Sequence, residues 1–275
     1  MSHLSIRTLA SGSSGNMALV RSGRTTLAVD FGIPSQRGIR AALNAAGIGI
    51  EDLDAAIVSH EHSDHLGYSG LALAAVAGVP VLAGPETALA AERVFRARRS
   101  SSLPEDLVRP IRSGTTYLVG DLEVTPFRVS HDVPTFGFTI ALRFAGGARK
   151  VAIATDLGCA PEALVPRFAD ADAVLIEANY NDDLLYRSGR SVEDKARVAS
   201  DRGHLSNLQS GGFLRRAFES SVCLPRHVIL VHLSEDHNRP PLARAEVGGK
   251  AGPAIGKGTA LHVAPRFDPG PLLEL

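Results

Sequence analysis

Residues 59–67 of the chain read Ser59-His60-Glu61-His62-Ser63-Asp64-His65-Leu66-Gly67. They contain the pattern H-x-H-x-D-H and directly follow an apolar run, residues 55–59, that predicts a short buried strand. Imidazole nitrogens and carboxylate oxygens are the usual ligands of zinc and similar ions. In a loop that leaves a strand, the side chains of His60 and His62 can point the same way and bind one metal ion. Asp64 and His65 can then bind at a second metal position next to it. A solvated polar turn or a helix cap explains a single histidine better than it explains this whole set.

Three further candidate ligands each follow an apolar run of strand type. His131 comes after residues 124–129, Asp156 comes after residues 151–154, and His232 ends the run Val228-Ile-Leu-Val-His. Side chains at strand ends project into a common mouth, where ligands from distant parts of a sequence can converge. Each of them alone is more often an ordinary strand-end residue. Together, and after the histidine loop, they predict a metal site.

Short strand patterns alternate with helical stretches along the chain, without an internal repeat or a long linker. We expect strands over residues 4–9, 17–20, 25–30, 55–59, 81–83, 116–118, 122–129, 138–144, 151–154, 173–177, 227–232 and 259–263. We expect helices after the N-cap Ser35 to about Ala46, after the histidine loop, and over residues 85–97, 161–169, 192–201 and 207–219. Two halves that each mix strands and helices predict layered sheets with helices outside. Apart from its last strand, the segment after Pro240 has no interpretation.

The overall composition limits the class of protein. The chain has 275 residues, and 29 basic residues balance 29 acidic ones, so the net charge is zero. This argues mildly against a protein that coats nucleic acid, although a local basic groove remains open. The longest apolar runs, such as Leu71–Ala77, are too short for a membrane span, and Met1–Arg7 lacks a signal-peptide pattern. Two cysteines, Cys159 and Cys223, predict a reduced, cytoplasmic protein.

Five segments in this order resemble the metallo-β-lactamase superfamily: Val29-Asp30-Phe31-Gly32, the histidine loop, His131, Asp156 and His232. The resemblance covers about the first 240 residues. It implies an α/β fold, the four-layer αββα sandwich of this family, and we expect one such domain over residues 1–275. It also implies that one ion is bound by His60, His62 and His131, that a second is bound by Asp64, His65 and His232, and that Asp156 bridges them. Asp30 would hold the histidine loop in place.

Two ions in such a site stand about 3.5–4 Å apart and can share a hydroxide, whose pKa they lower. Zn²⁺ suits the imidazole-rich ligand set, and the carboxylates also admit Mn²⁺ or iron. The identity of the two divalent ions therefore stays open.

A second pair of residues narrows the chemistry. Glu177-Ala-Asn-Tyr and Gly203-His204-Leu-Ser-Asn resemble the Glu…Gly-His pair of the phosphodiesterase branch of the superfamily, which includes tRNase Z. The resemblance implies that His204 protonates the leaving oxygen and that Glu177 orients it. A phosphodiester needs such an acid because an alkoxide is a poor leaving group. The plainer interpretation makes His204 an ordinary residue at the start of the helix over residues 207–219.

The N-terminal loop Ala10-Ser-Gly-Ser-Ser-Gly-Asn16 has amides that could face an anion, although such a loop is more often a simple hairpin turn. Together with Ser-His-Glu-His-Ser-Asp-His, Gly-His-Leu-Ser-Asn and His232-Leu-Ser-Glu-Asp-His-Asn-Arg-Pro it resembles the bacterial YycJ/WalJ group, whose members are regarded as metal-dependent DNA exonucleases. One position departs from that pattern, since His237 stands where asparagine is expected. The candidate substrate contacts are Ser13, Asn16, Ser206 and Asn207.

We therefore expect a dinuclear metal-dependent phosphodiesterase, a 5′-acting DNA exonuclease in which Asp64, His204 and Glu177 are the catalytic residues and DNA is the partner. The basic run Arg93, Arg96, Arg98 and Arg99 could contact phosphates, although a solvated helix face explains it more simply. The alternatives are a thioesterase or lactonase, a cyclic-nucleotide or phosphonate-pathway phosphodiesterase, and a non-catalytic metal-binding scaffold. The sequence predicts no membrane association and does not indicate the oligomeric state.

Overall fold

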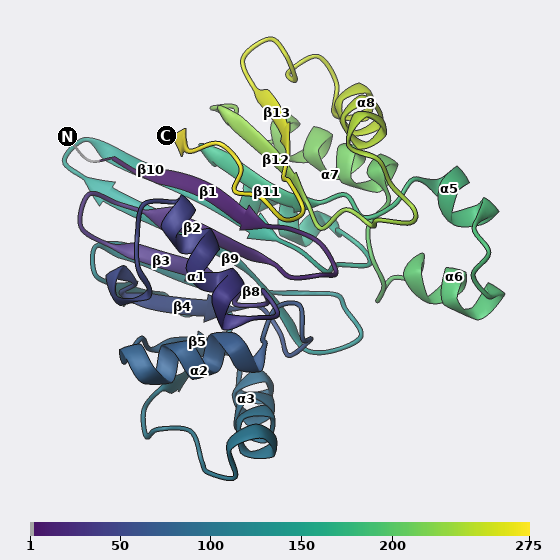
Figure 1. The fold of residues 1–275 in the computed structure, drawn as a ribbon. Coiled ribbons are helices and arrows are strands. Elements are labelled where there is room, and N and C mark those ends of the chain that lie inside the picture. The colour runs from purple at the N-terminus through teal and green to yellow at the C-terminus, as the bar shows by residue number, and fades with distance from the viewer. Residues whose placement is uncertain (1–2) are drawn as a thin grey trace. The chain divides into compact units, whose positions relative to one another are not determined.

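The computed structural model describes residues 3–275, and Met1 and Ser2 lie outside the described residues (Figure 1). The chain divides into two compact units. Of the described residues, unit 1 contains 3–127, Leu142–Ala148 and Pro265–Glu274, and unit 2 contains Arg128–Ala141, Arg149–Ala264 and Leu275. The chain passes between the units within strands β8 (Leu122–Val129), β9 (Thr135–Phe144) and β10 (Gly147–Ala154). The single domain expected over residues 1–275 stays a prediction.

Unit 1 is built on a sheet in which the strand order is β14-β1-β2-β3-β4-β5-β6. The bounds of these strands are β1 Ser5–Ala10, β2 Met17–Arg21, β3 Thr26–Val29, β4 Ala55–Val58, β5 Val81–Ala83, β6 Val108–Pro110 and β14 Leu273–Glu274. Strands β3 to β6 run parallel, and both faces of β3 and β4 are buried. The carboxyl ends of parallel strands meet at one edge of a sheet, which is where side chains from separate loops can converge.

Three helices cover this sheet: α1 Gln36–Ala45, α2 Tyr68–Ala77 and α3 Pro85–Arg99. As expected, Ser35 is the N-cap of α1, and its Oγ accepts a hydrogen bond of 3.0 Å from the Gly38 amide. The helices contribute Ile39, Leu71 and Phe95 to one buried apolar cluster that they share with the strands. A short 3₁₀ helix (Ile50–Asp52) precedes β4, and β7 (Tyr117–Val119) pairs with β8 (Leu122–Val129) as an antiparallel hairpin.

Unit 2 has a parallel arrangement of β10 (Gly147–Ala154), β11 (Ala173–Glu177), β12 (His227–Val231) and β13 (Ala260–Val263). Strand β9 covers Thr135–Phe144. The helices are α4 Val165–Phe168, α5 Asp182–Arg187, α6 Val192–Val198, α7 Asn207–Glu219 and α8 Pro240–Ala251, with a 3₁₀ turn at Glu162–Leu164. Phe168 and Phe213 pack edge to face, with ring centroids 4.9 Å apart, and join α4 to α7.

The expected α/β class, with two sheets flanked by helices, is confirmed. The bounds expected for residues 81–83, 122–129, 173–177 and 207–219 agree with β5, β8, β11 and α7. Other expectations were wrong in part. The helix over residues 161–169 is a 3₁₀ turn followed by the short α4, the strands over 138–144 and 151–154 begin earlier, and the helix over 192–201 ends at Val198. Elements β6, α5, α8 and β14 were not expected.

Within residues 3–275, no helix is both long enough and apolar enough to cross a membrane.

Candidate metal centre

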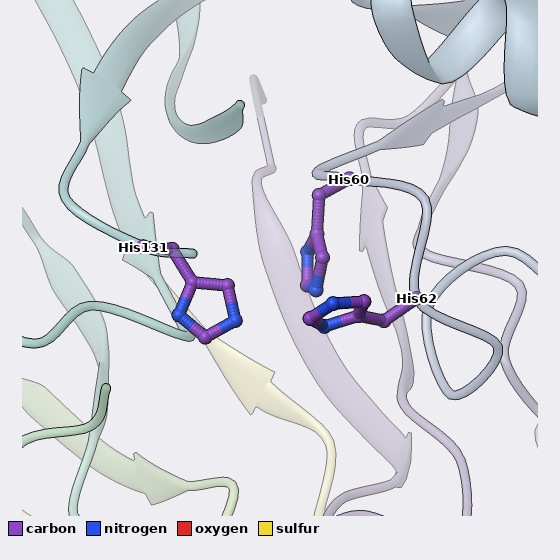
Figure 2. Close-up of side chains that lie close together, drawn as sticks. All are labelled: His60, His62 and His131. Atoms are coloured by element: carbon purple, nitrogen blue, oxygen red, sulfur yellow. The ribbon is translucent and has the colours of Figure 1, made fainter. Parts of the chain in front are cut away.

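The histidine loop of unit 1 leaves the carboxyl end of β4 and gathers four candidate ligands. His60 and His65 are fully buried, and their ring centroids lie 4.2 Å apart. The His62 ring meets the His60 ring edge to face at 4.6 Å, and Figure 2 shows these two imidazoles close together. A candidate ligand atom of His60 lies within 4.8 Å of one on His62, and the same holds for Asp64 and His65. The loop therefore presents imidazole nitrogens and a carboxylate at the spacing a cation needs.

Asp30, directly after β3, holds the histidine loop through both of its carboxylate oxygens. One of its carboxylate oxygens accepts a hydrogen bond of 2.8 Å from the Ser59 amide, and the other lies 2.8 Å from His65 Nδ1. Since a carboxylate only accepts, Nδ1 of His65 is the donor, and Nε2 then carries the lone pair that can bind a metal. Asp30 has φ 61°, a conformation that aspartate tolerates better than most residues.

The N-terminal loop is tied to the same region through Asn16. Its amide N–H donates to the Asp64 carbonyl at 2.8 Å, and its Nδ2 lies 3.3 Å from Asp64 Oδ2 and 3.0 Å from His65 Nε2. The side chain of Asn16 is buried. Gly32 completes the packing, because a Cβ there would stand 1.6 Å from the Asp64 carbonyl oxygen. These contacts suit a residue that positions Asp64, while substrate contact by Asn16 stays a prediction.

Unit 2 brings together a second set: Asp156, Glu177, His204 and His232 each offer an atom within 4.8 Å of the others. Asp156 follows β10, Glu177 ends β11 and His232 follows β12, so three parallel strands deliver them to one edge. Asp156 has φ 54° and His232 has φ 57°. The Nδ1 atom of His232 lies 3.5 Å from Asp156 Oδ1. Backbone strain at two of these residues is typical of functional sites.

Glu177 is fully buried and organises this set. Its Oε1 accepts hydrogen bonds from Nδ1 of His204 at 2.7 Å and from Nδ1 of His232 at 2.9 Å. Its Oε2 accepts from the amides of Leu157 and Leu205 at 3.1 and 3.2 Å. Both histidines therefore have Nε2 as the nitrogen that can face a ligand or a substrate.

The charges of this cluster set its proton affinities. Burial lowers the pKa of His204, but the carboxylates of Glu177 and Asp156 outweigh burial, so this pKa is raised above its ordinary value. Burial raises the pKa of Glu177, yet the charge of His204 and the hydrogen bonds from His204 and His232 outweigh it, so this pKa is lowered. The His204 side chain is 14% exposed, and it is therefore the member of the pair that can reach a substrate.

His131 is the remaining predicted ligand of unit 2 (Figure 2). Its Nδ1 donates to the Gly203 carbonyl at 3.0 Å, so the lone pair is on Nε2, which lies 3.9 Å from Asp156 Oδ1. Burial lowers the pKa of His131, against the raising effect of Asp156 and Asp132, which favours the neutral form that binds metals. Arg202 donates to the carbonyls of His131 and Asp132 at 3.1 and 2.9 Å and holds this turn.

Two predicted substrate contacts of unit 2 are buried and hydrogen-bonded within the protein. Ser206 is the N-cap of α7 and accepts from the Gln209 amide. Asn207 donates to Asn238 at 3.1 Å and to Glu246 at 2.8 Å. These are structural contacts, and binding of substrate by Ser206 and Asn207 stays a prediction. In unit 1, by contrast, the exposed Ser13 lines a cavity of about 370 Å³ together with Asp64.

The basic run of α3 is mostly engaged in contacts with other side chains. Arg93 lies 3.6 Å from Glu61, Arg96 pairs with Glu92, and Arg99 donates to the Tyr68 hydroxyl at 2.7 Å. Arg98 lines the same cavity as Ser13 and Asp64. It is therefore the member of the run best placed for an anion bound beside the histidine loop.

The sequence alone did not assign two residues that support the site. Asn179 donates through Nδ2 to the His232 carbonyl at 2.9 Å, and the Ser59 hydroxyl lies 3.0 Å from His60 Nδ1. Ser59 directly precedes the histidine motif, and Asn179 lies inside the segment Glu177-Ala-Asn-Tyr. Their positions were a usable signal, because metal-bound histidines generally hydrogen-bond through their second ring nitrogen or are held by nearby polar groups.

Both residue sets suit a divalent cation by their donor chemistry, since each combines imidazole nitrogens with at least one carboxylate at close spacing. A family model described as the beta-lactamase superfamily domain matches residues 33–233. The chain belongs to the metallo-β-lactamase superfamily. This confirms the resemblance inferred from the histidine loop and the four other segments.

Relatives within the metallo-β-lactamase superfamily are similar over most of the chain. Exodeoxyribonuclease YycJ of Bacillus anthracis is 31% identical over 263 residues, which are 94% of this chain and 94% of that one. Exodeoxyribonuclease WalJ of Streptococcus pneumoniae is 32% identical over 235 residues, 86% of this chain and 83% of the relative. The crystal structure of the metallo-β-lactamase fold protein YhfI of Bacillus subtilis covers the whole of both chains with a TM-score of 0.73 at 18% identity. The fold is thus that of the superfamily, and the chain is a metal-dependent hydrolase.

Proposed function

We propose that this hydrolase is a dinuclear phosphodiesterase that removes nucleotides from DNA, acting from the 5′ end. The observation that carries the proposal is the 2.7 Å hydrogen bond between Glu177 and His204, in the same cluster as Asp156 and His232. A thioesterase or lactonase needs no acid of this kind for its leaving group, whereas a phosphodiester does. The names of the relatives, exodeoxyribonuclease YycJ and exodeoxyribonuclease WalJ, support DNA as the substrate.

The ligand assignment that we propose follows the superfamily pattern. One ion would be held by His60, His62 and His131, a second by Asp64, His65 and His232, and Asp156 would bridge them. When bound, two such ions supply an activated water nucleophile and neutralise negative charge at phosphorus. We favour Zn²⁺ or Mn²⁺, with iron as a third candidate, because imidazole and carboxylate ligands suit all three.

The residues of the chain would share the remaining work. His204, protonated and held by Glu177 through Nδ1, donates its Nε2 proton to the leaving oxygen. Glu177 keeps the charge of that imidazolium balanced and, through the same carboxylate oxygen, holds the His232 ring. Asp30 and Asn16 keep the histidine loop in the position that the ligands require. The proposal also takes residues 1–275 as one working domain in the cytoplasm, where the free thiols of Cys159 and Cys223 persist.

The test of the activity is cleavage of 5′- and 3′-labelled single- and double-stranded DNA with Mn²⁺ or Zn²⁺, beside an Asp64→Ala protein. We expect metal-dependent loss of the labelled strand that disappears with Asp64→Ala, and a label pattern that gives attack from the 5′ end. Turnover of a thioester or cyclic nucleotide without any cleavage of DNA would assign the protein to that alternative class instead.

The acid assignment has a separate test in two substrates. His204→Ala should lower kcat on DNA by about 10²- to 10⁴-fold, the usual contribution of a general acid. It should lower hydrolysis of bis(p-nitrophenyl) phosphate much less, because p-nitrophenolate leaves without protonation. Glu177→Gln should lower DNA cleavage at least as much as His204→Ala, and it should also lower hydrolysis of bis(p-nitrophenyl) phosphate, because Glu177 holds the proposed metal ligand His232 as well as His204. For His204→Ala, equal losses on both substrates would remove His204 from the role of acid.

A further inference from the structure

Two adjoining cavities of unit 1 have linings of which the proposed chemistry uses only Asp64. The first, of about 370 Å³, is lined by Asp64, Tyr68 and Arg98 among others. The second, of about 450 Å³, is lined by Arg266, Phe267 and the small side chains of α1. Ser14 and Pro34 belong to both linings. The cavities therefore adjoin at these two residues, and together we call them the unit 1 groove, which starts at a predicted metal ligand and leads away from it.

The part of the groove next to Asp64 has the chemistry of a nucleotide site. Arg98 supplies an exposed cation, and Tyr68 supplies an aromatic ring that is held by the hydrogen bond from Arg99 Nε to its hydroxyl. Ser13 and Ser14 add hydroxyl groups, and within residues 3–275 their amides donate no hydrogen bond. In a loop whose glycines have positive φ, such amide N–H groups can donate hydrogen bonds to a bound anion.

The second part of the groove repeats this combination of a cation and an aromatic ring. Phe267 is 69% exposed, and the Arg266 guanidinium lies 6.0 Å from the centre of its ring. Arg266 Nη1 donates to Ser14 Oγ at 3.3 Å, and it lies so close to Gly12 that a Cβ there would stand 2.7 Å from it. Glycine at position 12, with φ 133°, thus lets Arg266 lie against the N-terminal loop.

We propose that the unit 1 groove binds a single strand of DNA and leads its end to the metal centre. This inference rests on the proposed function. Arginine beside an aromatic ring, repeated along a groove, is the chemistry that binds single strands, because every base has a face to stack and every nucleotide has a phosphate. Asp64 and Asp268 are the carboxylates in the lining. Asp64 is assigned to a metal and is not counted here. The charges of Arg98 and Arg266 then exceed that of Asp268 by one, so the lining of the groove has a net charge of +1.

The groove also accounts for DNA binding by a chain whose net charge is zero. Without a strong global field, affinity for a polyanion has to come from a few placed cations and from stacking. Both are concentrated here in a depression that starts at the histidine loop. A single strand fits this arrangement better than a duplex, whose bases are already stacked on each other.

Binding of a fluorescent oligothymidine with phosphorothioate linkages, which resist cleavage, tests the groove in the metal-loaded protein. We expect Phe267→Ala to weaken binding about 5- to 100-fold, the usual effect of losing one stacked base, and Arg98→Ala to weaken it and reduce its salt dependence. Two matched controls remove an exposed aromatic and an exposed arginine of unit 2. Tyr186→Ala and Arg226→Ala should bind like the wild type.

Cleavage separates this inference from the proposed function. For Phe267→Ala and Arg98→Ala, the ratio of kcat/KM on single-stranded DNA to kcat/KM on bis(p-nitrophenyl) phosphate should fall by about tenfold or more. Wild-type protein that binds the oligothymidine through these residues but cleaves no DNA would keep the groove and overturn the nuclease. Wild-type cleavage with unchanged binding and an unchanged ratio in both variants would overturn the groove and keep the nuclease.

Discussion

Aspartate at position 30 shows how much of the candidate site depends on single residues. Its two oxygens serve different partners, the Ser59 amide and His65 Nδ1, and its backbone adopts a positive φ. Asparagine keeps the tolerance for this backbone and one acceptor, but it loses the charge that faces the imidazole. Alanine loses all three. The two substitutions therefore separate the effect on the metal from the effect on the backbone.

We expect Asp30→Asn to lower Zn²⁺ affinity about 10- to 100-fold, as loss of the partner of a ligating histidine does, with little change in the stability of the metal-free protein. Asp30→Ala should show the same loss of affinity and an additional loss of about 1–3 kcal/mol of unfolding free energy from the strained backbone. Chelator competition and urea unfolding measure the two quantities. Asp54→Asn is the control, since that carboxylate accepts from the Thr26 amide away from the histidine loop. Zn²⁺ affinity that is equal in all four proteins would rule out a positioning role for Asp30.

Between elements, the turn from α6 to α7 contains His204 and contacts His131, two members of the unit 2 site. A Cβ on Gly203 would stand 2.2 Å from the Arg197 carbonyl oxygen, and the Gly203 carbonyl accepts from His131. Gly203→Ala should therefore shift both His131 and His204, with a loss of about 1–3 kcal/mol of stability and a marked loss of DNA cleavage. Gly189→Ala, where a Cβ meets nothing within 4 Å, is the matched control and should behave as wild type. Full cleavage by Gly203→Ala would show that this turn adapts.

A second contact between elements predicts a dependence of stability on pH. Asp121, in the turn between β7 and β8, accepts hydrogen bonds from Ser22 and Thr25 in the turn before β3. Burial raises its pKa, but these hydrogen bonds and one from Arg24 outweigh burial, so the pKa of Asp121 is lowered. A lowered folded pKa gives stability that is present above the unfolded value, near pH 4, and is lost as the pH falls through the folded value.

Asp121→Asn should therefore cost about 1 kcal/mol of unfolding free energy at pH 7 in the metal-free protein, and this cost should shrink steadily below about pH 4. Urea unfolding of both proteins across that range measures the difference. A difference that stays constant down to pH 3 would mean that the charge of Asp121 contributes nothing.

Local patterns predicted the elements that carry their own signals. The buried strands β5 and β11 and helix α7 were found to the residue. Helix α8 was missed because it begins with two prolines and contains Gly248 and Gly249, so its stability comes from tertiary contacts: its Glu246 accepts from Asn181 and Asn207. Helix α5 was missed although its signals were present, an Asn181 cap followed by two aspartates.

For the candidate site too, the sequence predicted the parts that carry a local signal. The histidine motif marked the candidate ligands of unit 1, because they are close in sequence. The contacts that orient them, such as Asn16 with Asp64 and Glu177 with two histidines, join residues far apart in the chain. A single sequence gives the identity of such partners but not their distances. That is why Glu177 and His204 could be paired only through the family resemblance.

For the whole molecule, the proposed ligand sets divide between the two units, and this has a thermodynamic consequence. An ion that needs His60 of unit 1 and His131 of unit 2 stabilises the folded chain only when both are present. Zn²⁺ at about 100 times its dissociation constant should add about 2.7 kcal/mol for each site and raise Tm by several degrees.

We expect His60→Ala and His131→Ala to abolish the same part of this Tm increase, and chelation to abolish all of it. His227→Ala, which removes a histidine paired with His262 instead of a predicted ligand, should keep the full increase. Differential scanning calorimetry with and without Zn²⁺ measures each shift. A full increase in either His60→Ala or His131→Ala would show that no ion is shared between the units.

The positive φ values at Asp30, Asp156 and His232 limit how this protein can be redesigned. Glutamate has the same charge as aspartate, but its longer side chain gives no comparable help to a left-handed backbone. Replacing one of these aspartates by glutamate to change the metal preference would therefore disturb the backbone conformation at that position. This disturbance would come before any intended change in how the metal is coordinated. Libraries that aim at a new metal should leave these three positions alone, or sample only asparagine and glycine there, and place their diversity at His62, whose backbone is free of this restraint.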